Sequence, residues 1–197
     1  MPTDTSWTRD RALALMHEYT PSDALRKHMY AVELAMRAMA ERAGESPDEW
    51  GVVGLLHDFD YERFPNAGHA ADHEHPSEGV RILADQGFPE SWQRAILGHA
   101  AYTGVPRETP MARALFAVDE LAGFVVACAL VRPSRSLADL EVASVKKKLK
   151  DKAFARGVSR DDIRQGAEEL GLPLEELIDV VLAALRPHEA RLGLGSA

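Results

Sequence analysis

Several ionisable side chains lie in parts of the chain that are otherwise apolar. The pair His57-Asp58 follows the apolar run VVGLL, and Asp119 lies in the middle of the most apolar segment of the sequence. His28 and His99 each adjoin apolar positions of a helical pattern. A buried carboxylate is costly unless it is paired, hydrogen-bonded or bound to a metal. These side chains therefore predict one inward-facing site that several elements share.

Metal binding explains this combination of residue types with the fewest assumptions. Imidazole and carboxylate groups suit Mn, Fe, Co, Ni, Zn or Mg, and the presence of a single cysteine, Cys128, excludes an internal disulfide and a thiolate site. As neighbours on a helix, His57 and Asp58 would diverge by about 100°. They converge on one ion only at a helix end, or else they serve two neighbouring ions. We expect one or two divalent ions held between helices.

Each of these residues also has a structural interpretation. Asp119 could cap a helix or pair with an arginine such as Arg113, and His28 could be a hydrogen-bonded histidine at the edge of the core. In a chain with 8 histidines, a His-Asp dipeptide is weak evidence by itself. The residues taken together and in this order favour the metal interpretation.

The elements that must position these residues are predicted to be helices, which makes the fold class all-α. No stretch shows the sustained alternation of a strand, whereas helix start and stop signals recur. The segment Ser46-Pro47-Asp48-Glu49, for example, combines an N-cap hydroxyl, an early proline and a glutamate three residues on. The predicted helices cover residues 6–19, 22–43, 46–58, 77–87, 89–100, 110–131, 137–156, 160–170 and 173–186.

These helices are expected to form a compact helical bundle in one domain over residues 1–197. Its metal-binding core spans about residues 22–131, and further helices follow over 137–187. Residues 62–76 are predicted to form a polar loop, and residues 191–197 a frayed tail. The C-terminal helices could form a lid or the interface of a homodimer, and the sequence does not choose between these two roles.

Composition and charge limit the partners of the protein. A net charge of −8 argues against binding a nucleic-acid polymer, although a local cationic pocket could still receive a small phosphorylated substrate. No apolar run is long enough to span a membrane, and the N-terminus lacks the pattern of a secretory signal. We therefore expect a cytoplasmic protein without a membrane partner.

The order His28, His57-Asp58 and Asp119 on successive helices resembles that of the HD superfamily of metal-dependent phosphohydrolases. The resemblance covers about residues 22–131 and implies a helical core in which these four residues bind the metal. The segment HDFDYE is similar to that of a little-characterised bacterial group of HD hydrolases. The GYP signature of cyclic-dinucleotide phosphodiesterases in this superfamily is missing, which argues against that activity.

Two further histidines match the extra ligands of some dinuclear members of the superfamily. His75 begins an H-P-x-x-G pattern, and His99 lies where the second extra ligand is expected. The resemblance therefore implies six ligands and two ions, with Asp58 as a bridge. The alternative is that His75 is a solvent-exposed histidine of the loop GHAADHEHP and that His99 is structural.

The resemblance also implies the reaction, in which a metal-activated water hydrolyses a small phosphorylated metabolite or nucleotide. Asp58 is then a catalytic residue in contact with the metal. Asp60 and Glu62 are the nearest candidates for a proton donor, with a position in a surface turn as the alternative. Arg26 and Lys146 are the candidates for binding the substrate, although the basic run that begins at Lys146 could be a solvated helix face.

Two other functions fit the same ligand types. Some members of the superfamily with six His and Asp ligands are di-iron oxygenases, which iron content and oxygen uptake would distinguish from hydrolases. The third possibility is a non-catalytic HD module that binds a ligand. The presence of all four core ligand types in this chain argues against that third possibility.

Overall fold

The structure is a computed structural model that describes residues 7–195. Within these residues it consists of helices and connecting segments without a strand, which confirms the predicted all-α class. The elements are α1 (Arg9–Tyr19), α2 (Asp23–Ala43), α3 (Pro47–Leu56), α4 (Ser77–Asp85), α5 (Glu90–His99), η1 (Ala101–Thr103), α6 (Pro110–Leu130), α7 (Val142–Leu149), α8 (Arg160–Leu170), α9 (Leu174–Leu185) and η2 (Arg186–Leu192), where η marks a 3-10 helix.

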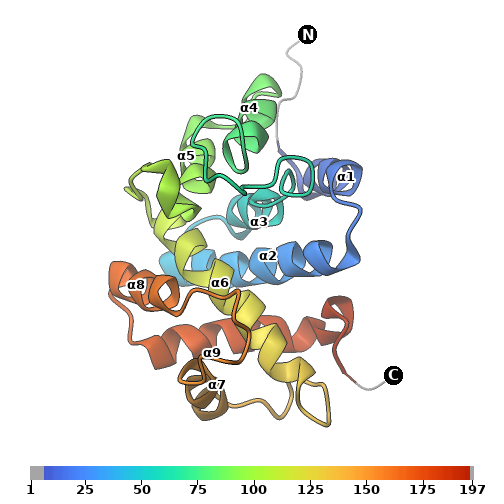
Figure 1. Ribbon diagram of the computed structural model, residues 1–197, viewed down its shortest axis with the longest axis vertical. Coiled ribbons are helices and arrows are strands. Elements are labelled where there is room, and N and C mark those ends of the chain that lie inside the picture. The colour runs from blue at the N-terminus through green and yellow to red at the C-terminus, as the bar shows by residue number, and fades with distance from the viewer. Residues whose placement is uncertain (1–6, 196–197) are drawn as a thin grey trace.

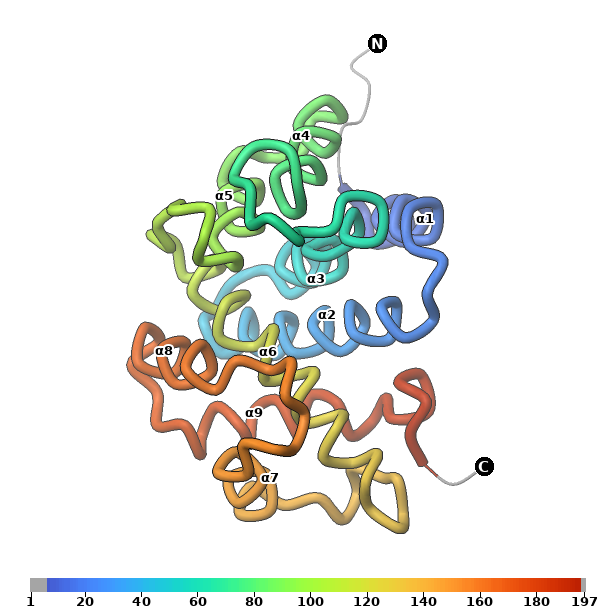
Figure 2. The backbone as a smooth tube through the Cα atoms, viewed as in Figure 1, coloured from blue at the N-terminus to red at the C-terminus, as the bar shows by residue number. Residues whose placement is uncertain are grey.

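Helix α2 lies at the centre of the molecule and packs against α3, α6 and α9 (Figure 1). Helix α6 crosses α2 and also contacts α5 and α8, so it joins the two ends of the bundle (Figure 2). In this view α1, α3, α4 and α5 lie on one side of α2, and α7 and α9 lie on the other. The C-terminal turn η2 returns to α2 and lies near its N-terminal end (Figure 1).

Several helix ends coincide with the residues that mark them in the sequence. Ser22 begins α2 by accepting a hydrogen bond from Leu25 N at 3.3 Å, and Ser46 begins α3 by accepting one from Glu49 N at 3.4 Å. Such caps satisfy backbone N–H groups that the first helical turn leaves without a partner. Gly44 ends α2 in the left-handed conformation, with φ of 72°.

Small residues allow two pairs of helices to approach closely. A Cβ atom placed on Gly54 of α3 would lie 3.0 Å from Val32 O of α2. A Cβ atom placed on Gly166 of α8 would lie only 2.5 Å from Ala117 Cα of α6. Both helices that receive these contacts carry metal-ligand candidates, so the close packing holds their backbones in fixed positions.

The structure corrects both bounds of the helix predicted over residues 137–156, because α7 begins at Val142. Helix α7 ends at Leu149, and the chain from Lys150 to Ser159 forms turns. The guanidinium of Arg160 donates hydrogen bonds to Ala155 O at 2.5 Å and to Val158 O at 2.7 Å. This side chain satisfies carbonyl groups that a continued helix would have satisfied, so it stabilises the turns instead.

The prediction of a frayed tail is wrong for the residues that the structure describes. Residues 186–192 form η2, and Leu192 and Leu194 are buried with 3% and 4% exposure. Residue 6, the predicted start of the first helix, and residues 196–197 of the tail lie outside the described residues. None of the described helices is long and apolar enough to cross a membrane.

Candidate metal centre

Three residues from three elements form what we call the first ligand group, His28, His57 and Asp119. The Nε2 atom of His28 lies 3.0 Å from Asp119 Oδ1 and 3.2 Å from His57 Nε2. The Nε2 atom of His57 lies 3.3 Å from the same carboxylate oxygen. Helix α2 supplies His28, the C-terminal end of α3 supplies His57, and the middle of α6 supplies Asp119. Their ligand atoms therefore converge on a space of the size of one ion.

The second ligand group consists of Asp58, His75 and His99. The Oδ1 atom of Asp58 lies 3.2 Å from His75 Nε2 and 3.6 Å from His99 Nε2. His75 lies at the end of the 57–76 loop, just before α4, and His99 is the last residue of α5. The ring centroids of His99 and His57 are 5.3 Å apart, so the two ligand groups are neighbours.

The carboxylate of Asp58 faces both groups. Its Oδ1 atom points to the second group, while its Oδ2 atom lies 3.4 Å from His57 Nε2 and 3.6 Å from His28 Nε2. The neighbouring residues His57 and Asp58 can do this because α3 ends at Leu56, so neither is held on a straight helix face. The sequence left two possibilities for the pair, a position at a helix end or binding to two neighbouring ions. The structure places the pair at the end of α3, and the binding of two ions stays a prediction.

Hydrogen bonds on the far side of three imidazole rings turn their Nε2 atoms toward the centre. The Nδ1 atom of His57 donates to Gly54 O at 2.8 Å, and that of His99 donates to Ile96 O. Both acceptors are carbonyls of a last helical turn, which lack a partner within the helix. The Nδ1 atom of His75 instead donates to the carboxylate of Asp60 at 2.7 Å. With the proton on Nδ1, each Nε2 lone pair is free to bind a metal.

Asp60 is a buried acidic residue that holds His75 in place. Its side chain is 1% exposed, and its Oδ2 atom accepts a hydrogen bond from Gly79 N at 2.7 Å. A Cβ atom at residue 79 would lie 2.5 Å from Asp60 Cγ. The glycine of the H-P-x-x-G pattern therefore leaves room for the carboxylate that orients the histidine of the same pattern. These are the contacts of a positioning residue, and the predicted role of Asp60 as a proton donor stays a prediction.

The charges of the cluster are strongly coupled. Burial lowers the pKa of His57, but Asp58 and Asp119 more than offset this and raise it well above its ordinary value. Burial likewise lowers the pKa of His75, yet hydrogen bonds to Asp58 and Asp60 raise it to about 9. Burial would raise the pKa of Asp119, whereas the charge of His57 and hydrogen bonds from the histidines hold it well below its usual range. These shifts favour ionised Asp58 and Asp119 and protonated His57 and His75 when no cation is bound.

The donor set fits divalent metal ions. It contains imidazole nitrogens and carboxylate oxygens, and each group of three leaves coordination positions for water or substrate. Among the described residues, the ion-pair partners of Asp58 and Asp119 are all histidines. Arg113, the alternative partner for Asp119, donates to the carbonyl groups of Arg107 and Glu108 instead. A cluster of histidines and carboxylates without a lysine or arginine counter-ion is the pattern expected of a metal site.

Three other residues singled out by the sequence have contacts elsewhere. Glu62 accepts a hydrogen bond from Ser22 N at 3.0 Å, at the start of α2. Arg26 donates to Thr20 O and to His17 O, at 2.5 and 3.1 Å. Lys146 forms an ion pair with Glu175 of α9. The expected roles of Glu62 in proton transfer and of Arg26 and Lys146 in substrate binding therefore stay predictions.

Three further residues around the candidate centre were not predicted from the sequence. Tyr102 of η1 donates a hydrogen bond to His75 O at 2.5 Å and receives one from Asn66 Nδ2 at 3.0 Å, which ties the 57–76 loop to η1. Glu120 adjoins Asp119, and burial together with that neighbouring charge raises its pKa to about 7. The one signal for Glu120 in the sequence is a second acidic residue inside the apolar segment 110–131. For Tyr102 and Asn66 the sequence holds no comparable signal.

A family model described as the HD domain matches residues 25–123, half of the 197-residue chain. The matched range contains all six residues of the two ligand groups. No curated protein and no solved structure matches the chain.

Proposed function

The chain belongs to the HD-domain family, and from this premise we propose that it is a metal-dependent phosphohydrolase with two divalent ions. Its substrate is a small phosphorylated metabolite or nucleotide. The observation that carries the proposal is the position of Asp58, which directs one carboxylate oxygen toward each ligand group, at 3.2 Å from His75 and 3.4 Å from His57. Asp58 is one of the three donors of the second group and also faces the first group, as expected of a carboxylate shared by two ions in a hydrolytic centre.

When bound, such ions polarise a phosphoryl oxygen and lower the pKa of a coordinated water. The chain contributes four imidazoles and two carboxylates that hold the ions, and Gly54, Ile96 and Asp60 fix the rings of three of the histidines. In the reaction the oxygen of water forms a bond to phosphorus and the bond from phosphorus to the ester oxygen breaks. The leaving oxygen takes up a proton.

Metal content by elemental analysis tests the centre directly. We expect about two transition-metal ions per chain in protein that is purified without chelator and supplied with Mn²⁺. Asp58→Asn removes the shared carboxylate charge and should retain less than one ion. Asp179→Asn is the matched control, because Asp179 is exposed on α9 and no ion pair forms at its carboxylate among the described residues. A chain that binds no metal under these conditions would overturn the proposal.

Hydrolysis of 4-nitrophenyl phosphate and bis(4-nitrophenyl) phosphate by the same three proteins tests the reaction. We expect turnover by the wild type and the Asp179→Asn control, and a loss of at least about a hundredfold in Asp58→Asn. The donor set equally suits iron, so two iron atoms per chain together with oxygen uptake and no phosphate release would replace the hydrolase with a di-iron oxygenase.

A further inference from the structure

A cavity of about 340 Å³ lies directly beside the first ligand group. His28 belongs to both, since its Nε2 atom faces Asp119 and its side chain also lines the cavity. The other walls come from the first turns of α2, the C-terminal half of α6, Arg135 in the segment between α6 and α7, and η2 with the glycine after it. Ligand pockets start at about 300 Å³, so the cavity has room for one ring or a short chain.

The wall that α6 contributes is a continuation of the face that carries the metal ligand. Asp119, Gly123, Val126 and Leu130 follow one another at intervals of four, three and four residues. Residues at these intervals share one side of a helix. Val126 is half-buried and Leu130 is 41% exposed, so an apolar surface leads from the ligand group toward solvent. The His28 ring lies against this face at Gly123, where an added Cβ atom would be 3.5 Å from His28 Nδ1. One edge of the ring therefore faces the ligand group and the other adjoins the cavity.

The charged residues of the cavity favour an anion. Lys27 forms an ion pair with Asp23 at 2.6 Å, and a Cβ atom on Gly193 would lie 2.8 Å from Lys27 Nζ, so the lysine lies across the C-terminal turn. Arg135 is exposed, and its guanidinium makes no hydrogen bond or ion pair with any residue from 7 to 195. Because the negative charge of Asp23 offsets the positive charge of Lys27, the net positive charge of the cavity comes from Arg135.

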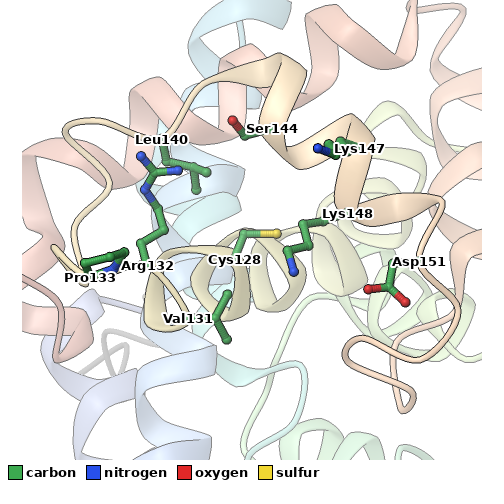
Figure 3. A pocket seen from close by; sticks show the side chains of 9 residues that line it. All are labelled: Cys128, Val131, Arg132, Pro133, Leu140, Ser144, Lys147, Lys148 and Asp151. Carbon is green, nitrogen blue, oxygen red and sulfur yellow. The ribbon is translucent and has the colours of Figure 1, made fainter.

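A larger cavity, of about 470 Å³, lies between α6 and α7 and has no metal-ligand candidate in its wall. Figure 3 shows it around Cys128, with Lys147 and Lys148 on the adjoining helix. Its arginine, Arg132, is paired with Asp139 at 2.7 Å. The larger volume therefore does not identify the substrate pocket. We favour the smaller cavity because His28 lies in its wall.

We propose that the cavity beside His28 binds the organic part of the substrate. That part has an apolar body about the size of one ring and ends in an anionic group, which Arg135 receives while the phosphoryl group lies at the ligand groups. The substrate class is thus a phosphate ester with a second anion at the opposite end. This inference rests on the proposed function, because it assumes that a phosphoryl group binds at the centre.

Calorimetric titration of the Mn²⁺-loaded protein tests the inference without turnover. The probes are inorganic phosphate, benzylphosphonate and 4-carboxybenzylphosphonate, which add first the ring and then the distal anion. The wild type should bind the carboxylated probe about tenfold more tightly than benzylphosphonate, as a charge-assisted hydrogen bond implies. Arg135→Gln should lose this preference. Arg156→Gln, at an exposed arginine that does not line the cavity, should keep it.

A second variant tests the apolar wall. Val126→Phe narrows the cavity beside the ring and should weaken benzylphosphonate binding at least about tenfold, while inorganic phosphate still binds. Metal content and melting temperature show that each variant is folded. Equal preference for the carboxylated probe in Arg135→Gln and wild type, or unchanged benzylphosphonate binding in Val126→Phe, would overturn the inference alone. Failure of metal-loaded wild type to bind inorganic phosphate would instead count against the proposed function.

Discussion

At the scale of single residues, the centre depends on what each histidine does with its second nitrogen. His57 and His99 use carbonyl groups at the ends of their own helices, whereas His75 has no helix of its own to use. Asp60 takes that place, and Gly79 gives it space. The ligand from the loop therefore needs a buried carboxylate to be oriented as firmly as the ligands from helices.

Asp60→Asn should lower the affinity of the protein for one of the two ions and leave its affinity for the other unchanged. The substitution removes the charge that orients His75 and raises its basicity, and loss of such a partner lowers metal affinity by about 10- to 100-fold. Competition with a chromogenic chelator gives the two affinities separately. Asp179→Asn serves again as the control, and two unchanged dissociation constants in Asp60→Asn would show that its hydrogen bond does not support the ligand.

Metal binding should release protons at neutral pH. Hydrogen bonds to Asp58 and Asp60 raise the pKa of His75 to about 9, so this imidazole carries a proton in metal-free protein at pH 7. An ion must displace that proton, and metal affinity should fall as the pH is lowered below about 9. Titration at pH 7 in buffers of different ionisation enthalpy counts the protons released. A heat that does not depend on the buffer would contradict the prediction.

At the scale of elements, the ligands meet because helices approach closely at small residues. Helix α6 carries Asp119 on one face, while another of its residues, Ala117, contacts Gly166 of α8. Helix α3 approaches α2 at Gly54, three residues before His57. Backbone contacts of this kind fix the axial position of a helix, and a ligand set of six atoms tolerates little sliding.

Gly166→Ala should destabilise the protein by about 1–3 kcal/mol, the usual range for overpacking. The added methyl group would lie 2.5 Å from Ala117 Cα, a backbone atom that cannot turn aside. Urea unfolding of metal-loaded protein measures the change. Gly157→Ala is the matched control, since a Cβ atom there would have no neighbour within 4 Å among the described residues. Equal urea midpoints for the two variants would show that the contact between α6 and α8 adjusts to the added methyl group without a loss of stability.

At the scale of the whole molecule, the candidate metal centre joins segments that are far apart in the chain. The two ligand groups draw residues from α2, the end of α3, the 57–76 loop, α5 and α6. The unfolded chain does not hold these residues together, so ions held by these two groups would bind the folded state preferentially. The centre is therefore expected to contribute to stability as well as to chemistry.

Chelation should lower the melting temperature, and Mn²⁺ should restore it. Free metal at about 100 times its dissociation constant stabilises a fold by about 2.7 kcal/mol, which is about 5–10 °C for a chain of this size. Differential scanning fluorimetry at a series of Mn²⁺ concentrations measures the shift. Asp58→Asn should show a much smaller response. A melting temperature that is insensitive to chelator in wild-type protein would argue that the centre is not occupied.

Cys128 should react with thiol reagents only after unfolding. It is buried in the wall of the cavity between α6 and α7, and burial raises its pKa to about 12. At pH 8 only about one thiol in 10,000 would be ionised, and the thiolate is the reactive form. Reaction with Ellman's reagent should be slow in buffer and complete in guanidinium chloride. Rapid reaction of the folded protein would show that this cavity opens to solvent.

Much of the fold follows from local helix start and stop signals that can be identified in the sequence. Hydroxyl caps such as Ser22 and Ser46 and the stop at Gly44 act within one turn, so they set helix ends wherever the helix packs. The types and order of the ligand residues are equally a property of the chain. Their number, and the expectation of a bridging Asp58, came from the resemblance to a family.

Other features arose from packing between distant segments. Leu192 and Leu194 of the C-terminal segment pack into the hydrophobic core. Helix α7 ends at Leu149, and Arg160 satisfies carbonyl groups of the turns that follow it. The cavity beside His28 likewise needs α2, α6 and η2 together. The sequence by itself therefore determined most of the helices and the types and order of the candidate ligand residues. The tertiary structure decided what surrounds them, because burial and contact between distant residues depend on packing that no local signal encodes.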